Sequence, residues 1–199
     1  MKDTYRTFSD YTEGLFKDKG SKFFAYGYPV KNENEVKDII QTIKKEHHSA
    51  RHHCYAYKIG AIDSSFRAND DGEPSGTAGK PILGQIESND LTNVLIVVVR
   101  YFGGILLGTS GLINAYRNAA AECINNANIE NNIIENELSV SFTYEQLNTA
   151  MRVVKEEKVR IVEQNFQESC KMRIAVKQSM FEDVFQKFES IYGIEVSKC

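Results

Sequence analysis

Six consecutive apolar residues at positions 94–99, Val-Leu-Ile-Val-Val-Val, constrain the fold more than any other stretch of the chain. A strand with one face in water alternates apolar and polar residues, and this run shows no such alternation. We therefore expect a central strand that is covered on both faces. Although it is the longest apolar run, it falls far short of the roughly 20 residues of a membrane-spanning helix.

The residues around this run predict alternating strands and helices. Two β-rich segments at 11–16 and 23–30 flank a polar, glycine-containing turn, as in a hairpin. Apolar residues spaced three and four apart predict a helix that begins at Asn32 or Asn34 and ends near His47. The other elements expected in this half are a strand at 54–59, a long polar loop at 63–81, a helix at 82–88 and a long helix at 110–126.

An asparagine-rich stretch at 125–132 separates this half from a second pattern. We place the boundary there, between an N-terminal domain of residues 1–130 and a C-terminal domain of residues 131–199. The second pattern predicts a strand at 137–144, a helix at 144–157, strands at 159–166 and 170–176 joined around 165–169, a helix at 181–192 and a strand at 194–197. This βαββαβ order is that of a ferredoxin-like domain, so the expected class is α+β.

Composition excludes several classes of protein. With 24 Lys and Arg against 27 Asp and Glu, the net charge of -3 argues against a highly basic nucleic-acid packaging protein, although not against a local basic face. The N-terminal residues lack the apolar segment of a secretory signal. The four cysteines (Cys54, Cys123, Cys170 and Cys199) form no CxxC pair, so we expect reduced thiols, a cytoplasmic location and no membrane partner.

All four histidines fall between positions 47 and 53, next to Cys54. Zinc accepts such ligands, but side chains alternate along a strand, so only His52 and Cys54 would share a face. No second ligand pair with suitable spacing follows, and we predict no metal site and no cofactor. His47 and His48 are expected at the C-terminal end of a helix, where the helix dipole favours positive charge.

Three carboxylates gather in one short turn, at Asp70, Asp71 and Glu73. Such a cluster could hold Mg²⁺ through one or two carboxylates, or dock a cationic partner. It could equally be a solvated turn in which aspartate caps backbone donors. The sequence leaves these alternatives open.

The segment that follows, at 76–81, partly resembles a phosphate-binding loop. A Walker motif needs glycine where Pro74 stands and Ser or Thr where Pro81 stands, so a P-loop NTPase is rejected. A looser anion site remains open, because Thr77, Gly79 and Lys80 precede a helix N-terminus.

After the apolar run, the chain enters a glycine-rich turn that begins with Arg100, Tyr101 and Phe102. The arginine supplies positive charge, and the two rings could stack on bases. Alternatively, the glycines only turn the chain while Arg100 pairs with an acidic loop residue. The remaining residues of interest here are Gly103, Gly104, Gly108 and Gly111 in the turn and Arg117 in the following helix. The serine in this turn does not lie in the GxSxG pattern of a nucleophile elbow.

We expect these three stretches to fold into one anion-binding cleft. The candidate residues are His52, Cys54, Asp70, Asp71, Glu73, Thr77, Lys80, Arg100, Tyr101, Gly103, Gly104, Gly108, Gly111 and Arg117.

The same stretches carry a family resemblance. The strings HHCYAY at 52–57, DDGEPSGTAGKP at 70–81, VRYFGG at 99–104 and LGTSGLINAY at 107–116 closely resemble the IMPACT family, including its bacterial members of the YigZ type. The second string is the most specific. The histidine that the family carries two residues before the cysteine falls on His52, and Ser110 stands where many members have glycine.

The resemblance implies that the N-terminal domain is an α/β sandwich like domain IV of elongation factor G, with a left-handed βαβ crossover. It implies a C-terminal domain like the ferredoxin-like domains of that factor. Eukaryotic relatives act in translational control, by competing for a co-activator of a general-control kinase. The expected function is therefore non-enzymatic and linked to translation, with RNA, the ribosome or a translation-associated protein as partner.

Two alternatives remain. One is a small Mg-dependent hydrolase or transferase acting on a phosphorylated ligand, with His52 as acid or base and Asp71 and Glu73 as metal ligands. The other is a protein-interaction module that docks through the acidic turn at 70–73.

Overall fold

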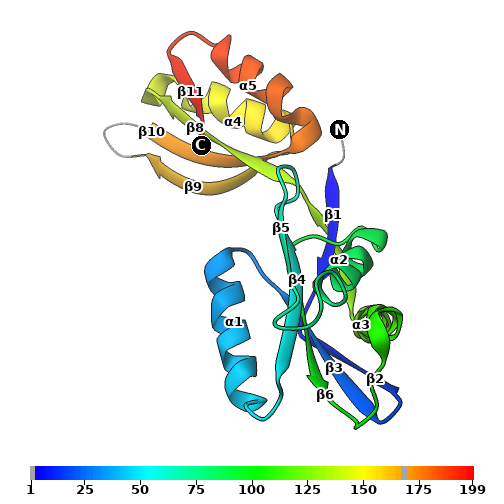
Figure 1. Ribbon diagram of the computed structural model, residues 1–199. Helices are drawn as coiled ribbons and strands as arrows, with labels where there is room; N and C mark the ends of the chain where they lie inside the picture. Colours follow the sequence, from blue (N-terminus) through cyan, green and yellow to red (C-terminus); the bar gives the residue numbers. More distant parts are fainter. Residues whose placement is uncertain (1–2, 167–169) are drawn as a thin grey trace. The chain divides into compact units, whose positions relative to one another are not determined.

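The computed structural model describes residues 3–166 and 170–199. Contacts divide the chain into two compact units, which we treat separately (Figure 1). The N-terminal unit is Tyr5–Asn132, and the C-terminal unit is Ile133–Cys199 together with the start of the chain up to Thr4. Every helix in the described residues is too short or too polar to cross a membrane.

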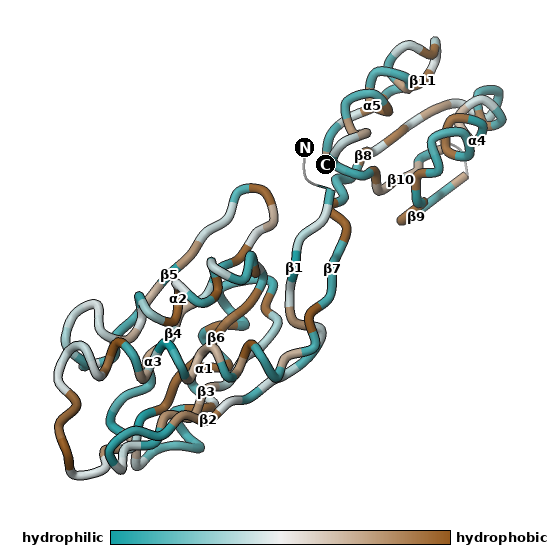
Figure 2. Tube along the Cα trace, turned by 90° about the vertical axis from the view of Figure 1, so that its right-hand side faces the viewer, coloured by the Kyte–Doolittle hydropathy of each residue, from teal (hydrophilic) through white to brown (hydrophobic). Residues whose placement is uncertain are grey.

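A five-stranded sheet forms the centre of the N-terminal unit. Its strands are β2 (Thr12–Asp18), β3 (Ser21–Pro29), β6 (Val94–Tyr101), β4 (His52–Ile59) and β5 (Ser65–Asn69), in the order β2-β3-β6-β4-β5. Each strand is antiparallel to its neighbours. The middle strand, β6, is buried from Val94 to Arg100, and Figure 2 shows its apolar character along the trace. The prediction of a central strand from the apolar run is confirmed.

Helices cover both faces of this sheet. On one face α1 (Glu33–Glu46) packs on Leu95, Val97 and Val99. On the other face α2 (Gly79–Ser88) and α3 (Gly108–Asn125) pack on the alternate residues of the same strand, Val94, Ile96 and Val98. The side chain of Asn32 caps α1 by accepting the N–H groups of Asn34 and Glu35, as Asn, Asp and Ser do at helix starts.

One crossover in this sheet must be left-handed. The connections β3–α1–β4 and β5–α2–β6 each join parallel strands across one intervening strand. A rotation of the sheet by 180° in its own plane superposes the strands of one connection on those of the other, with the same directions. Their helices, α1 and α2, nevertheless lie on opposite faces of the sheet. They therefore have opposite hands, and one breaks the usual right-handed rule. This agrees with the left-handed crossover that the family resemblance implies.

Two strands lie where polar sequence predicted irregular chain. β5 occupies part of the expected loop at 63–81, and β7 (Ile129–Ile133) occupies part of the asparagine-rich stretch and pairs with β1 (Thr4–Phe8). Neither is a central strand of a larger sheet. An edge strand is held by backbone hydrogen bonds and needs few apolar side chains, so its sequence carries little of the usual strand signal.

The C-terminal unit has the predicted ferredoxin-like order. Its elements are β8 (Glu135–Phe142), a 3-10 turn η1 (Tyr144–Gln146), α4 (Leu147–Glu156), β9 (Arg160–Phe166), β10 (Cys170–Lys177), a second turn η2 (Gln178–Met180), α5 (Phe181–Glu189) and β11 (Ile194–Lys198). The strands pair antiparallel in the order β11-β8-β10-β9. Leu138, Val140, Ile174 and Phe188 belong to its core. The expected connection at 165–169 lies partly outside the described residues.

Candidate functional site

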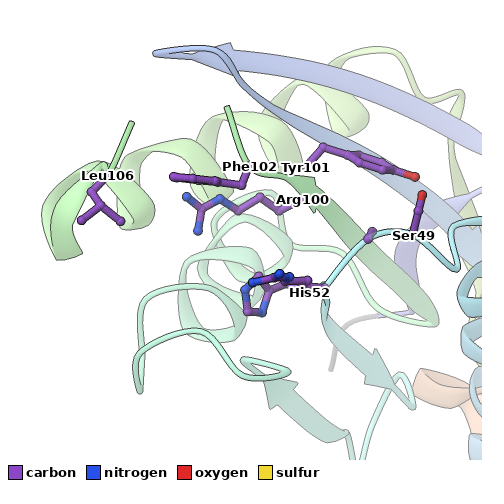
Figure 3. Close-up of a pocket in the computed structure, with 8 residues that line it drawn as sticks. Ser49, His52, Arg100, Tyr101, Phe102 and Leu106 are labelled. Atoms are coloured by element: carbon purple, nitrogen blue, oxygen red, sulfur yellow. The ribbon is translucent and has the colours of Figure 1, made fainter. Parts of the chain in front are cut away.

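A pocket of about 660 Å³ opens at the end of β6 in the N-terminal unit (Figure 3). It is lined by Ser49, Ala50, Arg51, His52, Arg100, Tyr101, Phe102 and Leu106. The strand register explains why two of the predicted residues meet there, since His52 on β4 lies directly opposite Arg100 on β6. We call this hollow the β6 pocket.

Arg100 is the fixed cation of the β6 pocket. Its side chain is 92% buried, and its Nη1 donates to the Glu73 carboxylate at 2.7 Å. The guanidinium carbon lies 5.6 Å from the centroid of the buried Phe23 ring and 5.7 Å from that of Phe102. The Arg100 Nε is buried without a hydrogen-bond partner among the described residues. The structure therefore shows the alternative in which Arg100 pairs with an acidic loop residue.

Glu73 links the pocket to the core. The same Oε1 that accepts Arg100 also accepts the Tyr116 hydroxyl at 2.8 Å. The Cys54 thiol lies 3.3 Å from that hydroxyl and 3.0 Å from the Asp70 carbonyl oxygen. Burial raises the pKa of the Cys54 thiol and of the Tyr116 hydroxyl, so both stay protonated at neutral pH. Cys54 thus acts as a buried structural thiol, since the thiolate is the reactive form.

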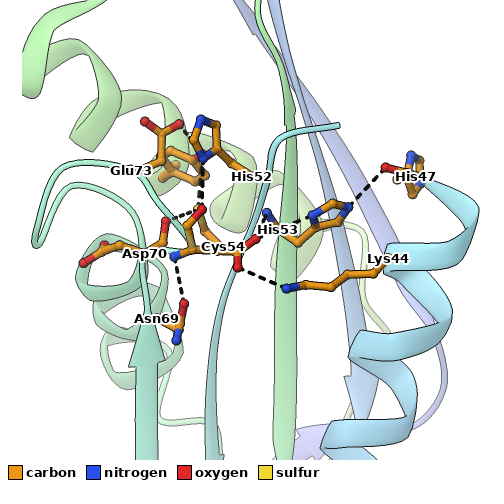
Figure 4. Close-up of polar contacts among 10 residues, drawn as sticks. Lys44, His47, His52, His53, Cys54, Asn69, Asp70 and Glu73 are labelled. Atoms are coloured by element: carbon orange, nitrogen blue, oxygen red, sulfur yellow. Dashed lines mark hydrogen bonds and ion pairs between the residues drawn. The ribbon is translucent and has the colours of Figure 1, made fainter. Parts of the chain in front are cut away.

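Asp70 occupies the helix N-terminus at which an external anion was expected (Figure 4). Its carboxylate accepts the backbone N–H groups of Gly76 at 2.8 Å, Ala78 at 3.0 Å and Gly79 at 2.8 Å. Burial raises the pKa of Asp70, but these three donors outweigh that effect and hold it below its usual value. Thr77 is also occupied, because its hydroxyl donates to the Pro74 carbonyl. The prediction of a looser anion site at the N-terminus of this helix is therefore wrong.

Asp71 ties the acidic turn to β4 and α1. Its carboxylate accepts the His53 N–H at 2.7 Å and pairs with Lys44 at 3.0 Å. Burial raises the pKa of Asp71, and these two contacts more than offset that rise, so the pKa is lowered. Its carbonyl oxygen lies 3.0 Å from Nδ1 of His52, which orients the imidazole beside the pocket.

The three carboxylates of the acidic turn are therefore engaged within the chain. Asp70, Asp71 and Glu73 each bind a different partner within the chain, and Glu73 is 97% buried in its side chain. Among residues 3–166 and 170–199, no three His, Cys, Asp or Glu side chains are placed to share a metal ion. Both the magnesium hypothesis and the acidic docking element need free carboxylates at this turn, and the geometry supports neither.

The glycines of the turn after β6 act differently from one another. A Cβ at Gly103 would lie 1.9 Å from the carbonyl carbon of Gly20, so only glycine allows this turn to pack on the β2–β3 hairpin. Gly104 and Gly108 have φ of +88° and +70°, and a Cβ at either would meet nothing within 4 Å. Gly111 lies in α3 beside the Leu107 side chain. None of the latter three is among the residues that line the β6 pocket.

Lys80 and Arg117 lie elsewhere. They line a second hollow of about 400 Å³ between α2 and α3, together with Gly76, Pro81, Gly84, Gln85, Ser88 and Ile113. The prediction of one cleft for all the candidate residues is therefore wrong. The helical turn that begins at Gly79 carries Lys80 onto α2, whereas Arg100 ends a strand of the sheet.

Sequence reasoning missed several residues of the β6 pocket. Ser49, Arg51 and Leu106 flank predicted residues, and the β4–β6 register would have placed Arg51 next to the pocket. The ring of Tyr101 is held from the α1 side, where His47 lies 2.9 Å from its hydroxyl and 2.8 Å from the Tyr26 hydroxyl. A shallower hollow of about 420 Å³ adjoins this side and shares Tyr101 and Phe102 with the β6 pocket.

The comparison with known families decides the assignment. The family model for the Impact N-terminal domain matches residues 19–124, which include the β6 pocket and the acidic turn. The chain belongs to the IMPACT family.

Relatives of this IMPACT family member match over most of its length. IMPACT family member YvyE of Bacillus subtilis is 35% identical over 178 residues, which cover 89% of this chain and 82% of that protein. IMPACT family member YigZ of Escherichia coli is 33% identical and covers 79% and 78%. A crystal structure of a hypothetical protein is 27% identical with a TM-score of 0.72, covering 98% of this chain and 97% of that one. The matches therefore extend beyond the N-terminal unit.

Proposed function

We propose that this IMPACT family member is a translation-linked regulatory protein that binds RNA through the β6 pocket. The family supports the link to translation. The observation that carries RNA binding is the chemistry of the lining, where Arg51 and Arg100 lie with the rings of Tyr101 and Phe102 and with no Asp or Glu. Cations bind phosphates, and aromatic faces stack on bases.

Among the described residues, the open face of β8 and β10 in the C-terminal unit carries no aromatic side chain. RNA-binding domains with a four-stranded ferredoxin-like sheet use aromatic side chains on that sheet. Here the face of β8 and β10 away from the core carries the half-buried Ser139 and Ser141 and the exposed Lys171 and Arg173. Arg173 is engaged with Glu137 and Glu163 on the same face. We therefore assign base contacts to the N-terminal unit.

The test is crosslinking in the native host, followed by sequencing of the RNA that is recovered with the protein. The Arg51→Glu variant should lose most of this RNA because it reverses the exposed charge of the pocket. Arg117→Glu is the matched control, since it reverses an exposed arginine in the other hollow. Equal recovery with wild type and Arg51→Glu, or in vitro binding that is insensitive to salt, would contradict the proposal.

A second candidate partner is a translation-associated protein. Ile105 and Leu106 are 56% and 83% exposed next to the pocket, and apolar side chains of this kind favour protein contacts. Recovery of the same proteins after nuclease treatment, with loss on Leu106→Asp but not on Arg51→Glu, would favour this candidate over RNA.

A further inference from the structure

We infer that the β6 pocket holds one unpaired nucleotide, so that this protein prefers single-stranded over duplex RNA. The inference rests on the proposed RNA binding and specifies its ligand. A volume of about 660 Å³ lies within the roughly 300–1,000 Å³ of sites that enclose one small molecule. A base that is paired and stacked within a helix cannot enter such a hollow, whereas an unstacked base can be splayed into it.

The ring of Phe102 provides the surface for the base. One face of this ring lies over the Arg100 guanidinium, which lies in turn over the buried Phe23 ring. The stack is thus built on the core, and yet Phe102 remains 57% exposed. A base laid on Phe102 would add a further layer to a stack whose lower members are already fixed, so little ordering is needed on binding.

Two features of the same hollow favour the phosphate. Arg100 is 92% buried and lines the pocket, and its Nε–H has no partner among the described residues, so Glu73 does not satisfy all of its donors. The exposed Arg51 adds a second positive charge to the lining.

Fluorescence anisotropy with the full chain tests the inference. The probes are a labelled 12-nucleotide RNA without self-complementarity and the same strand annealed to its complement, at one fixed salt concentration. We expect the single strand to bind at least about tenfold more tightly than the duplex. Phe102→Ala should weaken single-strand binding about 5- to 150-fold, the range found when one stacking aromatic is removed, and should leave duplex binding unchanged.

The chain offers a matched control for this variant. Phe66 on β5 is 60% exposed, like Phe102, but it lies outside the pocket lining, so Phe66→Ala should not change binding of either probe. Phe102→Trp keeps an aromatic face and should retain the single-strand preference. Circular dichroism confirms that each variant is folded.

The outcomes separate the inference from the proposed function. Equal binding of both probes, or single-strand binding that is insensitive to Phe102→Ala, overturns the nucleotide pocket while RNA binding stands. No binding of either probe at low salt overturns both. Competition by uridine or adenosine monophosphate, lost in Phe102→Ala, supports the pocket. Competition by inorganic phosphate of equal strength contradicts a role for the base.

Discussion

The ion pair between Arg100 and Glu73 makes a strong prediction about stability. Both side chains are more than nine-tenths buried, and their atoms lie 2.7 Å apart. Removing one partner leaves the other as an uncompensated buried charge, which costs about 3–5 kcal/mol. Glu73→Leu should therefore destabilise the N-terminal unit by this amount, a large share of the about 5–15 kcal/mol that typical domains have.

Thiol labelling resolved by peptide mass spectrometry measures this loss within each unit. Cys54 and Cys123 are fully buried in the N-terminal unit, so they react only when that unit opens. A loss of about 3–5 kcal/mol should raise their labelling rates roughly 140- to 3,700-fold, since each 1.4 kcal/mol is tenfold. Cys170, which is 2% exposed in the core of the C-terminal unit, reports whether the loss is confined to one unit.

A second variant separates lost charge pairing from lost packing. Arg100→Met together with Glu73→Leu replaces the buried pair by apolar side chains, a change that is often neutral or stabilising. The double variant should therefore label more slowly at Cys54 than Glu73→Leu does. If Glu73→Leu accelerates labelling less than about fivefold, or if the double variant is no slower, the pair is not the buried charge interaction that the geometry indicates.

Two further predictions concern the acidic turn and the glycines. Asp70→Asn keeps one acceptor oxygen but removes the charge and the acceptor for one of the three N–H groups, which should cost about 1–3 kcal/mol. Because the pKa of Asp70 is lowered on folding, its contribution to stability is present above its usual pKa of 3.8 and is lost as the pH falls through the folded value. The free energy of unfolding should therefore depend less on pH below pH 4 in Asp70→Asn than in the wild type. An unchanged dependence would refute this. Gly103→Ala should lower the free energy of unfolding, measured by urea denaturation, by more than the about 1–3 kcal/mol of ordinary overpacking. The reason is that its Cβ would lie 1.9 Å from a backbone atom. Gly84→Ala, inside α2 and with nothing within 4 Å of its Cβ, should instead stabilise by about 0.5–1 kcal/mol; equal effects of the two substitutions would contradict the contact.

The sequence predicted those parts of the fold that have their own hydrophobic pattern. The apolar run of β6 and the stripe of α1 each report burial directly, and the C-terminal unit repeats such patterns through its βαββαβ order. β5 and β7 were missed because edge strands are held mainly through the backbone, which carries no side-chain signal. The spacing of apolar residues therefore predicted the central strand and the helices better than the strands β5 and β7.

The candidate site divided for a different reason. His52 and Arg100, which the sequence analysis placed in one cleft, lie opposite one another because β4 pairs with β6 in this register. Lys80 was expected beside them from its motif alone, but the first turn of α2 directs it to another hollow. The direction of a side chain that follows a turn depends on the turn's backbone, which the order of residues does not reveal.

Residues 70–81, the string most specific to the family, do not line the β6 pocket, but Glu73 among them holds the lining residue Arg100. Asp70 accepts backbone N–H groups at the start of α2, and Glu73 pairs with Arg100, so both carboxylates are engaged within the protein. A carboxylate that already fills a helix N-terminus excludes a second anion there by charge repulsion. The pocket that we propose for RNA lies instead at the end of β6, where Phe102 remains exposed and Arg100 Nε has no partner among the described residues. The string at 70–81 is therefore structural in this protein. Substitutions within it should lower stability before they change the class of ligand that binds.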